Sequence, residues 1–381
     1  MHRLGLAVIA VLALAAGCAP AAPATGAAGG GGGPAAAAGP ASRAAPAAAQ
    51  TDAAYRQQVI DGARAEGEVN ALIHSTWTPD GLKQLEDAVE QEFGVRLKIN
   101  FTPVGNYPVR VAALLTELNA NITPSFDLYQ TSNTSTMTML DANVVEPVRW
   151  DALLPQDTPA GMAQADNRAV VVYTGHIGAM YDPTVIPDAE APRALKDLAN
   201  PRLRGKFMMY SYSDNYLAYT LVLGQDELLA ALRAAIANGG VPDTYANGFT
   251  RYAAREYPFA LMDSGYYATA VKRGLPAQFV SLDASFNSNH HLTVPIHAAH
   301  PNAAKLLAAV LVGPEGQRIA ENVIGTGNRY YESSTEYRLE QEARAAGLPD
   351  FSWTQPAAID LAHSPRSAEL RKQIDDILQG G

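Results

Sequence analysis

Three short segments of the sequence concentrate side chains that form hydrogen bonds. They span residues 75–76, 131–135 and 211–215, each shortly after a predicted strand, and consist mainly of Ser, Thr and Asn. Such donors, together with backbone N–H groups at helix N-termini, suit an oxyanion such as a phosphonate, a phosphate ester or a carboxylate. Helix capping is the alternative role for each segment taken alone. The candidate ligand-binding residues in these segments are Ser75, Thr76, Thr131, Ser132, Asn133, Ser213, Asp214 and Asn215.

Two adjacent tyrosines, Tyr266 and Tyr267, follow a further predicted strand and complete the candidate set. Their hydroxyls would serve an anionic ligand as donors without ionising. The alternative is that one ring packs in the core while the other is exposed to solvent.

The sequence predicts neither a resident metal nor an enzyme. His297 and His300 have a spacing compatible with metal binding, but His300 precedes Pro301 at a predicted helix start, and we expect His290 and His291 in a loop. There is no Gly-x-Ser-x-Gly, no His-Glu-x-x-His and no phosphate-binding loop. We therefore predict no cofactor and no catalytic residues.

The N-terminal segment predicts export and a lipid anchor. A short basic start leads into an apolar run, residues 4–16, that is too short to span a bilayer. Residues 14–18 (LAAGC) resemble a lipobox, the signal at which bacterial lipoproteins are cleaved and acylated. Cys18 is the single cysteine of the chain, so residues 1–18 are predicted to be a lipoprotein signal peptide that ends at a lipidated Cys18. The alternative is an ordinary secretory signal with an incidental cysteine.

Composition separates a tether from a folded part. Of the 32 residues from Ala19 to Gln50, 28 are Ala, Gly or Pro, and such a segment cannot bury enough surface to fold. We predict a disordered tether over residues 19–52. The remaining chain is long enough for about two domains. The net charge of −10 for all 381 residues argues against nucleic acid as a partner, because phosphate backbones require basic surface.

Helices and strands alternate along the folded part. Apolar spacing predicts helices over residues 55–67, 79–93, 108–119, 216–223, 228–238, 302–312 and 368–378, and strands over residues 69–73, 95–101, 126–130, 169–173, 206–210, 258–262 and 292–296. This order predicts mostly parallel sheets covered by helices. The polar segments follow strands that end at Ile73, Gln130, Tyr210 and Met262. Four polar loops at the carboxyl ends of parallel strands predict a single ligand-binding crevice.

Several motifs in this order resemble those of bacterial extracellular solute-binding proteins. They are EGEV at 66–69, FGV at 93–95, FDLY at 126–129, LDANVVEP at 140–147, LKDLANPRLRGKF at 195–207, HPNAAK at 300–305 and GPEGQ at 313–317. The resemblance covers residues 55–331 and is greatest to the ferric-iron type. It implies a two-lobed periplasmic-binding-protein-like (type II) α/β fold with a hinge. We place lobe 1 at residues 55–168 plus 290–381 and lobe 2 at residues 169–289.

The resemblance also implies a function. The protein would be the substrate-binding lipoprotein of an ABC importer, a monomer anchored outside the cytoplasm at the periplasm or cell surface, which delivers a solute to its permease. In ferric-binding members adjacent tyrosines coordinate the iron, because phenolate oxygen is a hard ligand. This chain has Thr76 and Thr131 where those members add a histidine and a glutamate. We therefore expect a small organic anion, with ferric iron held by Tyr266 and Tyr267 as the alternative. A sensor or adhesion lipoprotein without transport is a remoter alternative.

Overall fold

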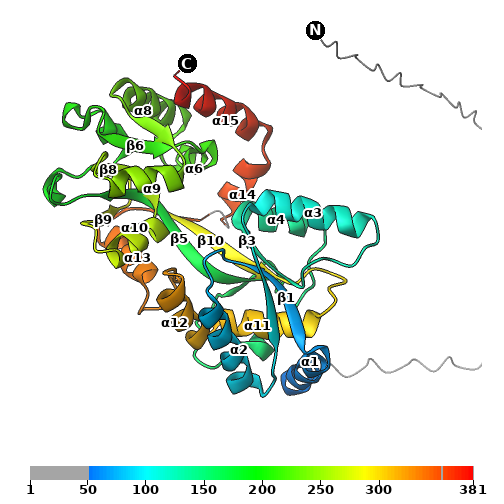
Figure 1. The fold of residues 1–381 in the computed structure, drawn as a ribbon. Coiled ribbons are helices and arrows are strands. Elements are labelled where there is room, and N and C mark those ends of the chain that lie inside the picture. Colours follow the sequence, from blue (N-terminus) through cyan, green and yellow to red (C-terminus); the bar gives the residue numbers. More distant parts are fainter. Residues whose placement is uncertain (1–50, 353–354, 381) are drawn as a thin grey trace, which may run out of the picture. The chain divides into compact units, whose positions relative to one another are not determined.

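The computed structural model describes residues 51–352 and 355–380; Cys18, the signal peptide and nearly all of the predicted tether lie outside these residues. The described strands form one mixed sheet in the order β2-β1-β3-β10-β5-β8-β6-β7, with β4 and β9 on β5 and β11 on β10 (Figure 1). The strands are β1 (Glu68–Ile73), β2 (Lys98–Pro103), β3 (Leu128–Ser132), β4 (Ala163–Gln164), β5 (Ala169–Tyr181), β6 (Phe207–Tyr210), β7 (Val241–Asp243), β8 (Phe259–Asp263), β9 (Gln278–Val280), β10 (Ser285–Thr293) and β11 (Asp350–Ser352).

The helices cover both faces of this sheet (Figure 1). Among the described residues, none is long and apolar enough to cross a membrane. They are α1 (Asp52–Glu66), α2 (Pro79–Phe93), α3 (Tyr107–Asn119), α4 (Asn133–Asp141), α5 (Trp150–Leu153), α6 (Ser213–Leu217), α7 (Thr220–Leu223), α8 (Gln225–Ala237), α9 (Tyr245–Ala253), α10 (Ser264–Lys272), α11 (Pro301–Val312), α12 (Pro314–Val323), α13 (Thr335–Ala345), α14 (Pro356–His363) and α15 (Pro365–Leu378).

Local sequence explains where many of these elements begin and end. Helix α2 is one example, since Thr78 accepts a hydrogen bond from the Gly81 N–H at 3.1 Å and Pro79 occupies its first turn. Gly94 ends the same helix with a φ of 64°, a conformation that glycine adopts at little cost. The same signals predicted a helix over residues 79–93, the bounds that α2 has.

Two long antiparallel strands join two parallel parts of the sheet. Strand β1 is parallel to β2 and β3, and β6 is parallel to β7 and β8. Strand β5 is antiparallel to both β10 and β8, and β10 is antiparallel to β3. Each lobe therefore has a parallel sheet as predicted, and β5 and β10 run through both lobes.

Each lobe has its own apolar core. In lobe 1 the core packs β1, β3 and the start of β5 against α1, α2 and α11, with a second cluster under α3 and α4. In lobe 2 the clusters gather β6, β8 and the end of β5 with α8, α9 and α10. Helix α15 belongs to the lobe 2 core through Leu370, Ile374 and Ile377, and it packs on α6 and α8. The structure differs here from the prediction that residues 290–381 lie in lobe 1, because an amphipathic stripe in a sequence does not name its partner surface.

Two local predictions are wrong. The helix predicted over residues 216–223 begins three residues earlier, at Ser213 of α6, so Asp214 and Asn215 lie inside its first turn and the alternative capping role does not apply to them. His290 and His291 lie within strand β10 and not in a loop. The start of β10 reads SFNSNHH, which lacks the apolar content of a predicted strand. Pairing with β3, β5 and β11 on its two sides satisfies its backbone nevertheless.

Candidate functional site

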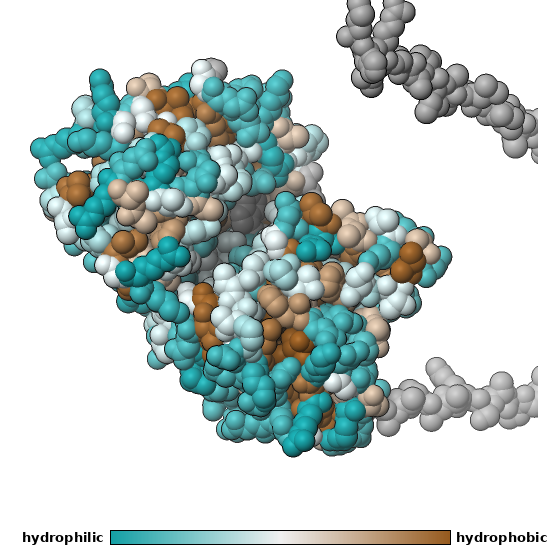
Figure 2. Space-filling view, viewed as in Figure 1, coloured by the Kyte–Doolittle hydropathy of each residue, from teal (hydrophilic) through white to brown (hydrophobic). Residues whose placement is uncertain are grey.

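The register of the sheet brings the carboxyl ends of β3 and β8 toward each other. Ser132 at the end of β3 pairs with His290, which pairs with Tyr173 of β5. Asp263 at the end of β8 pairs with Ile177 of β5. The two strands run in opposite directions, so both end toward the short stretch of β5 between Tyr173 and Ile177. The loops that follow them face each other across β5 and β10, where Figure 2 shows a hollow between the parts that carry α3 and α4 and those that carry α6 and α9.

Lobe 1 contributes a hydrogen-bonded group of polar rings to this cleft. The Tyr107 hydroxyl lies 3.0 Å from Nδ1 of His290 and accepts a hydrogen bond from Nε2 of Gln130 at 3.3 Å. Oε1 of Gln130 accepts from the backbone N–H of His74 at 2.9 Å. The His74 ring meets the Tyr173 ring edge-on at 6.1 Å. These contacts tie the loop after β1, the start of α3 and strands β5 and β10, here called the hinge strands, into one wall.

Lobe 2 contributes a group of tyrosines. The Tyr245 ring stacks on that of Tyr266 with centroids 5.6 Å apart, and Tyr212 and Tyr210 contact the other sides of Tyr245 at 5.4 and 5.7 Å. The Tyr245 hydroxyl accepts a hydrogen bond from Nδ2 of Asn215 at 2.7 Å. Tyr245 and Tyr266 are both partly exposed, so their rings form an aromatic wall that a solute can contact.

Asp263 lies between these two walls. Its Oδ1 accepts from the Gly265 N–H at 2.8 Å and so caps α10. A Cβ at Gly175 would lie 2.6 Å from Asp263 Oδ2, so the glycine in the middle of β5 leaves the space that the carboxyl occupies. Burial and, to a lesser degree, the charge of Glu336 raise the pKa of Asp263 to about 7. The cleft therefore contains a carboxyl that changes charge near neutral pH.

The other titratable groups of the cleft stay neutral. Burial, with a smaller contribution from the charge of Asp263, raises the pKa of Tyr107 to about 12 and raises the pKa of Tyr245 and Tyr266 above the usual value. Burial also lowers the pKa of His290 to about 4. The phenols are thus hydrogen-bonding groups at neutral pH, and ionising one to bind a metal costs more than in water. Within residues 51–352 and 355–380, no group of three or more His, Cys, Asp or Glu side chains is arranged to hold a metal ion.

Some candidate residues of lobe 1 are exposed toward the cleft, and others are buried. Ser75 and Thr76 are exposed; the hydroxyl of Ser75 accepts from the Gly105 N–H at 3.4 Å. Ser132 is partly exposed at the start of α4. Thr131 is buried with its hydroxyl 2.6 Å from that of Thr136. Asn133 is also buried, and its amide, oriented so that both its atoms are satisfied, pairs with the backbone of Asn289. Thr131 and Asn133 are thus engaged in packing.

The candidate residues of lobe 2 also divide. Tyr266 lies in the aromatic wall, whereas Tyr267 is buried against Phe279 and its hydroxyl accepts from Arg338 at 3.1 Å. Asn215 bonds the aromatic wall. Asp214 is held by Arg371 at 2.6 Å, and Ser213 is partly exposed in the first turn of α6. The two tyrosine hydroxyls therefore have different surroundings and do not form a pair.

Sequence reasoning missed four residues of the cleft: Gln130, Tyr245, Asp263 and His290. Gln130 and Asp263 each lie at or near the end of a strand, directly before polar residues. This position was a usable signal for a ligand-binding residue. Tyr245 and His290 carried no such signal, because α9 and the polar start of β10 were not predicted as elements.

The chain shares its fold with proteins of known structure. Among curated proteins none matches the sequence significantly. The fold is similar to iron-bound HitA from Pseudomonas aeruginosa (15% identity, TM-score 0.61, covering 81% of this chain and 99% of that one). It is also similar to the spermidine/putrescine-binding protein PotD from Streptococcus pneumoniae (12%, 0.62, 82% and 99%) and to AfuA from Actinobacillus pleuropneumoniae with fructose-6-phosphate bound (16%, 0.57, 82% and 98%). These likenesses confirm the predicted two-lobed fold.

The sequence itself matches a family. The profile of the bacterial extracellular solute-binding proteins matches residues 84–333. This match spans more than half of the chain and includes β3, the hinge strands β5 and β10, and most of lobe 2. The chain therefore belongs to the bacterial extracellular solute-binding protein family, the substrate-binding proteins that serve ABC transporters.

Proposed function

We propose that this protein captures a small organic anion in the cleft between its lobes and delivers it to the permease of an ABC importer. We infer the solute class from the difference between the two walls of the cleft. Lobe 1 offers neutral donors and an open helix N-terminus, and lobe 2 offers aromatic rings and an acid. A solute that fits both walls has an anionic group at one end and hydroxyl or ammonium donors at the other.

The anionic end is assigned to the start of α4. Ser132 is the N-cap of this nine-residue helix, yet its side chain makes no capping bond. The first-turn N–H groups are thus free of the side-chain acceptor that occupies them in α3 and α10. Ser132 and Thr134 add hydroxyls at the same place. Ser75 and Thr76 follow the neighbouring parallel strand β1, so they extend this group of donors.

The donor end of the solute is assigned to Asp263 and the aromatic wall of Tyr245 and Tyr266. A carboxyl accepts hydrogen bonds from hydroxyl or ammonium groups, and the stacked rings pack against the carbon skeleton or against a cation. Asp263 already caps α10, which makes that helix terminus a poor place for a second negative charge. The anion is therefore placed on lobe 1 and not on lobe 2.

Ferric iron is the less favoured solute. Tyr266 and Tyr267 do not present their hydroxyls to one point, because Arg338 holds Tyr267 while Tyr266 stacks on Tyr245. Burial raises the pKa of Tyr266, which opposes the phenolate that iron requires. Neutral Thr76 and buried Thr131 supply no further hard anionic ligand.

A thermal-shift panel tests the proposal. We expect a sugar phosphate or an aminoalkylphosphonate to raise Tm by mass action, and an alkylphosphonate without donors to raise it much less. Solution scattering with the binding probe should show a smaller radius of gyration as the lobes close. Ferric citrate should give no visible tyrosinate-to-iron charge-transfer band. Strong colour that disappears in Tyr266→Phe, with no stabilisation by any anion, would replace the organic anion by iron.

We further propose that Cys18 carries the lipid that anchors the protein outside the cytoplasm. The sequence of residues 14–18 is the support for this proposal. Cys18→Ala removes the residue that would be acylated, and stable anchoring depends on its acyl chains. The variant should therefore move from the membrane to the soluble fraction of a cell lysate. The matched control is Ser42→Ala, in the predicted tether, which should leave the protein on the membrane. Retention of Cys18→Ala on membranes after a high-salt wash would contradict lipidation.

A further inference from the structure

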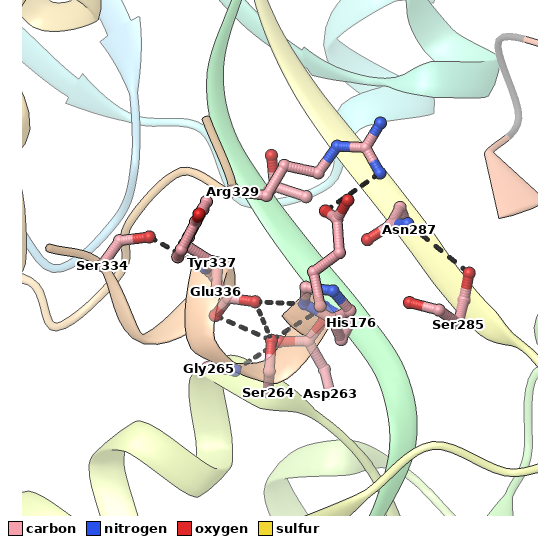
Figure 3. Close-up of polar contacts among 12 residues, drawn as sticks. His176, Asp263, Ser264, Gly265, Ser285, Asn287, Arg329, Ser334, Glu336 and Tyr337 are labelled. Carbon is pink, nitrogen blue, oxygen red and sulfur yellow. Dashed lines mark hydrogen bonds and ion pairs between the residues drawn. The ribbon is translucent and has the colours of Figure 1, made fainter. Parts of the chain in front are cut away.

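A fully buried acid, Glu336, lies on the opposite side of β5 from Asp263. Gly175 and His176 are neighbours on β5, so they project to opposite faces of the sheet. Asp263 occupies the space beside Gly175. On the other face Nδ1 of His176 lies 2.6 Å from Oε2 of Glu336 (Figure 3). One strand therefore separates the carboxyl of the cleft from the carboxyl of α13.

Ser264 links the two acids. Its hydroxyl lies 2.9 Å from each carboxylate oxygen of Glu336 and accepts from the His176 backbone N–H at 2.8 Å (Figure 3). Ser264 also directly follows Asp263 at the start of α10. His176, Ser264 and Glu336 are at most 2% exposed, so solvent does little to screen the charge of Glu336 from Asp263.

Glu336 lies in the first turn of α13, where Ser334 caps the helix by accepting from the Tyr337 N–H at 3.0 Å. The positive end of the helix dipole lies at this turn. The negative charge of one acid disfavours ionisation of the other across β5, and the charge of Glu336 raises the pKa of Asp263. The charge of Glu336 therefore acts on whichever groups nearby can still take up a proton.

The titratable groups around this pair come from several elements. On the cleft side Asp263 is near Tyr107 of α3, Tyr210 of β6, Tyr245 of α9 and Tyr266 of α10, and beyond β5 it is near His176 and Glu336; Glu336 is also near Glu321 of α12. The tyrosines stay neutral at physiological pH because burial raises the pKa of each. Asp263 is thus the cleft group in this set that exchanges a proton near neutral pH.

We propose that Glu336 is a positioning residue for solute binding: it lies behind β5, is hydrogen-bonded to Ser264 next to Asp263, and through its charge on Asp263 makes solute affinity rise with pH around neutrality. This rests on the proposed function, because it needs Asp263 to face the donor end of the solute. The carboxylate form accepts hydrogen bonds and attracts an ammonium group, whereas the protonated form does both less well. The physical consequence is a protein that binds more tightly at pH 8 than at pH 6.

The decisive measurement uses the ligand-free protein. The carboxyl ¹³C chemical shift of Asp263 should titrate with a midpoint near 7. In Glu336→Gln the midpoint should fall by about one pH unit or more, since the charge is removed and the amide keeps a hydrogen-bonding group toward Ser264. The matched control is Glu340→Gln, a buried acid one turn later on α13 that pairs with Arg329 and Arg344. It should leave the midpoint unchanged.

The binding arm uses an aminoalkylphosphonate measured by calorimetry between pH 5.5 and 8.5. Wild-type affinity should rise with pH, the rise should move to lower pH in Glu336→Gln, and Asp263→Asn should show only the titration of the probe. A wild-type Asp263 that titrates below pH 5, or an equal midpoint in Glu336→Gln, would overturn the inference whether or not the probe binds. If the midpoint moves as expected but no anion of the panel binds, the effect of Glu336 on Asp263 stands, whereas the proposed solute class and the pH dependence of its binding are both overturned.

Discussion

Asp263→Asn is expected to lower solute affinity about 10- to 100-fold at pH 8, because a charged hydrogen-bond acceptor at the donor end of the solute is replaced by a neutral amide. Asparagine retains an oxygen that can accept from the Gly265 N–H, so the cap of α10 survives. Calorimetry with an aminoalkylphosphonate measures the loss. An alkylphosphonate without donors should show little change between the two proteins.

The same substitution is expected to stabilise the fold above neutral pH. An aspartate of ordinary pKa about 4 in the unfolded chain reaches about 7 in the folded protein. The folded state therefore binds the extra proton between pH 4 and 7, and stability falls as pH rises through this window. Asp263→Asn removes this loss, so its Tm should exceed that of the wild type at pH 8 and equal it near pH 4.

A matched control is available for both effects. Asp283 also accepts a backbone N–H, that of Leu195 at 2.7 Å, and burial raises its pKa as well. Asp283→Asn should affect Tm in the same direction without changing solute affinity. Equal affinity of Asp263→Asn and the wild type at pH 8 would remove Asp263 from the site. A carboxyl that is buried for binding lowers the stability of the fold when it ionises, so its removal is expected to stabilise the fold and weaken binding.

The sequence predicted the arrangement of the cleft better than its contents. Polar segments after strands are a local signal, and their convergence follows from the general rule that ligands bind at the carboxyl ends of parallel strands. The structure satisfies that rule in an unexpected way. Strands β3 and β8 run in opposite directions, and both end beside the middle of β5, β3 through its pairing with β10. That geometry depends on β5 and β10 running through both lobes, which strand patterns alone do not reveal.

The missed residues have a common physical cause. His290 lies in a polar strand, and Tyr245 begins a nine-residue helix that contains Asn247 and Gly248, two poor helix formers. Glu336 lies more than 70 residues after Asp263 in the chain, and the tertiary packing of α13 against β5 brings them together. Local propensity carries no information on such contacts, so side chains that depend on them must be read from the structure.

Tyr266→Ala and Tyr267→Ala are expected to differ although the residues are adjacent. Tyr266 is partly exposed in the aromatic wall, so its loss should reduce solute affinity about tenfold with a small change in Tm. Tyr267 is 7% exposed and packs on Phe279, so its loss should lower the free energy of unfolding by about 3–5 kcal/mol. Calorimetry with an aminoalkylphosphonate and urea denaturation measure the two quantities separately.

The phenylalanine variants separate the hydroxyls from the rings. Tyr267→Phe keeps the ring on Phe279 and removes the hydrogen bond from Arg338, which should cost about 1 kcal/mol of stability and leave solute affinity unchanged. A loss of affinity in Tyr267→Phe that equals the loss in Tyr266→Phe would mean that both hydroxyls reach the solute. The lobes would then have to move so that Arg338 releases Tyr267 on closure. Consecutive residues at the start of α10 are about 100° apart around the helix axis, so one tyrosine can face the cleft while the next serves the core.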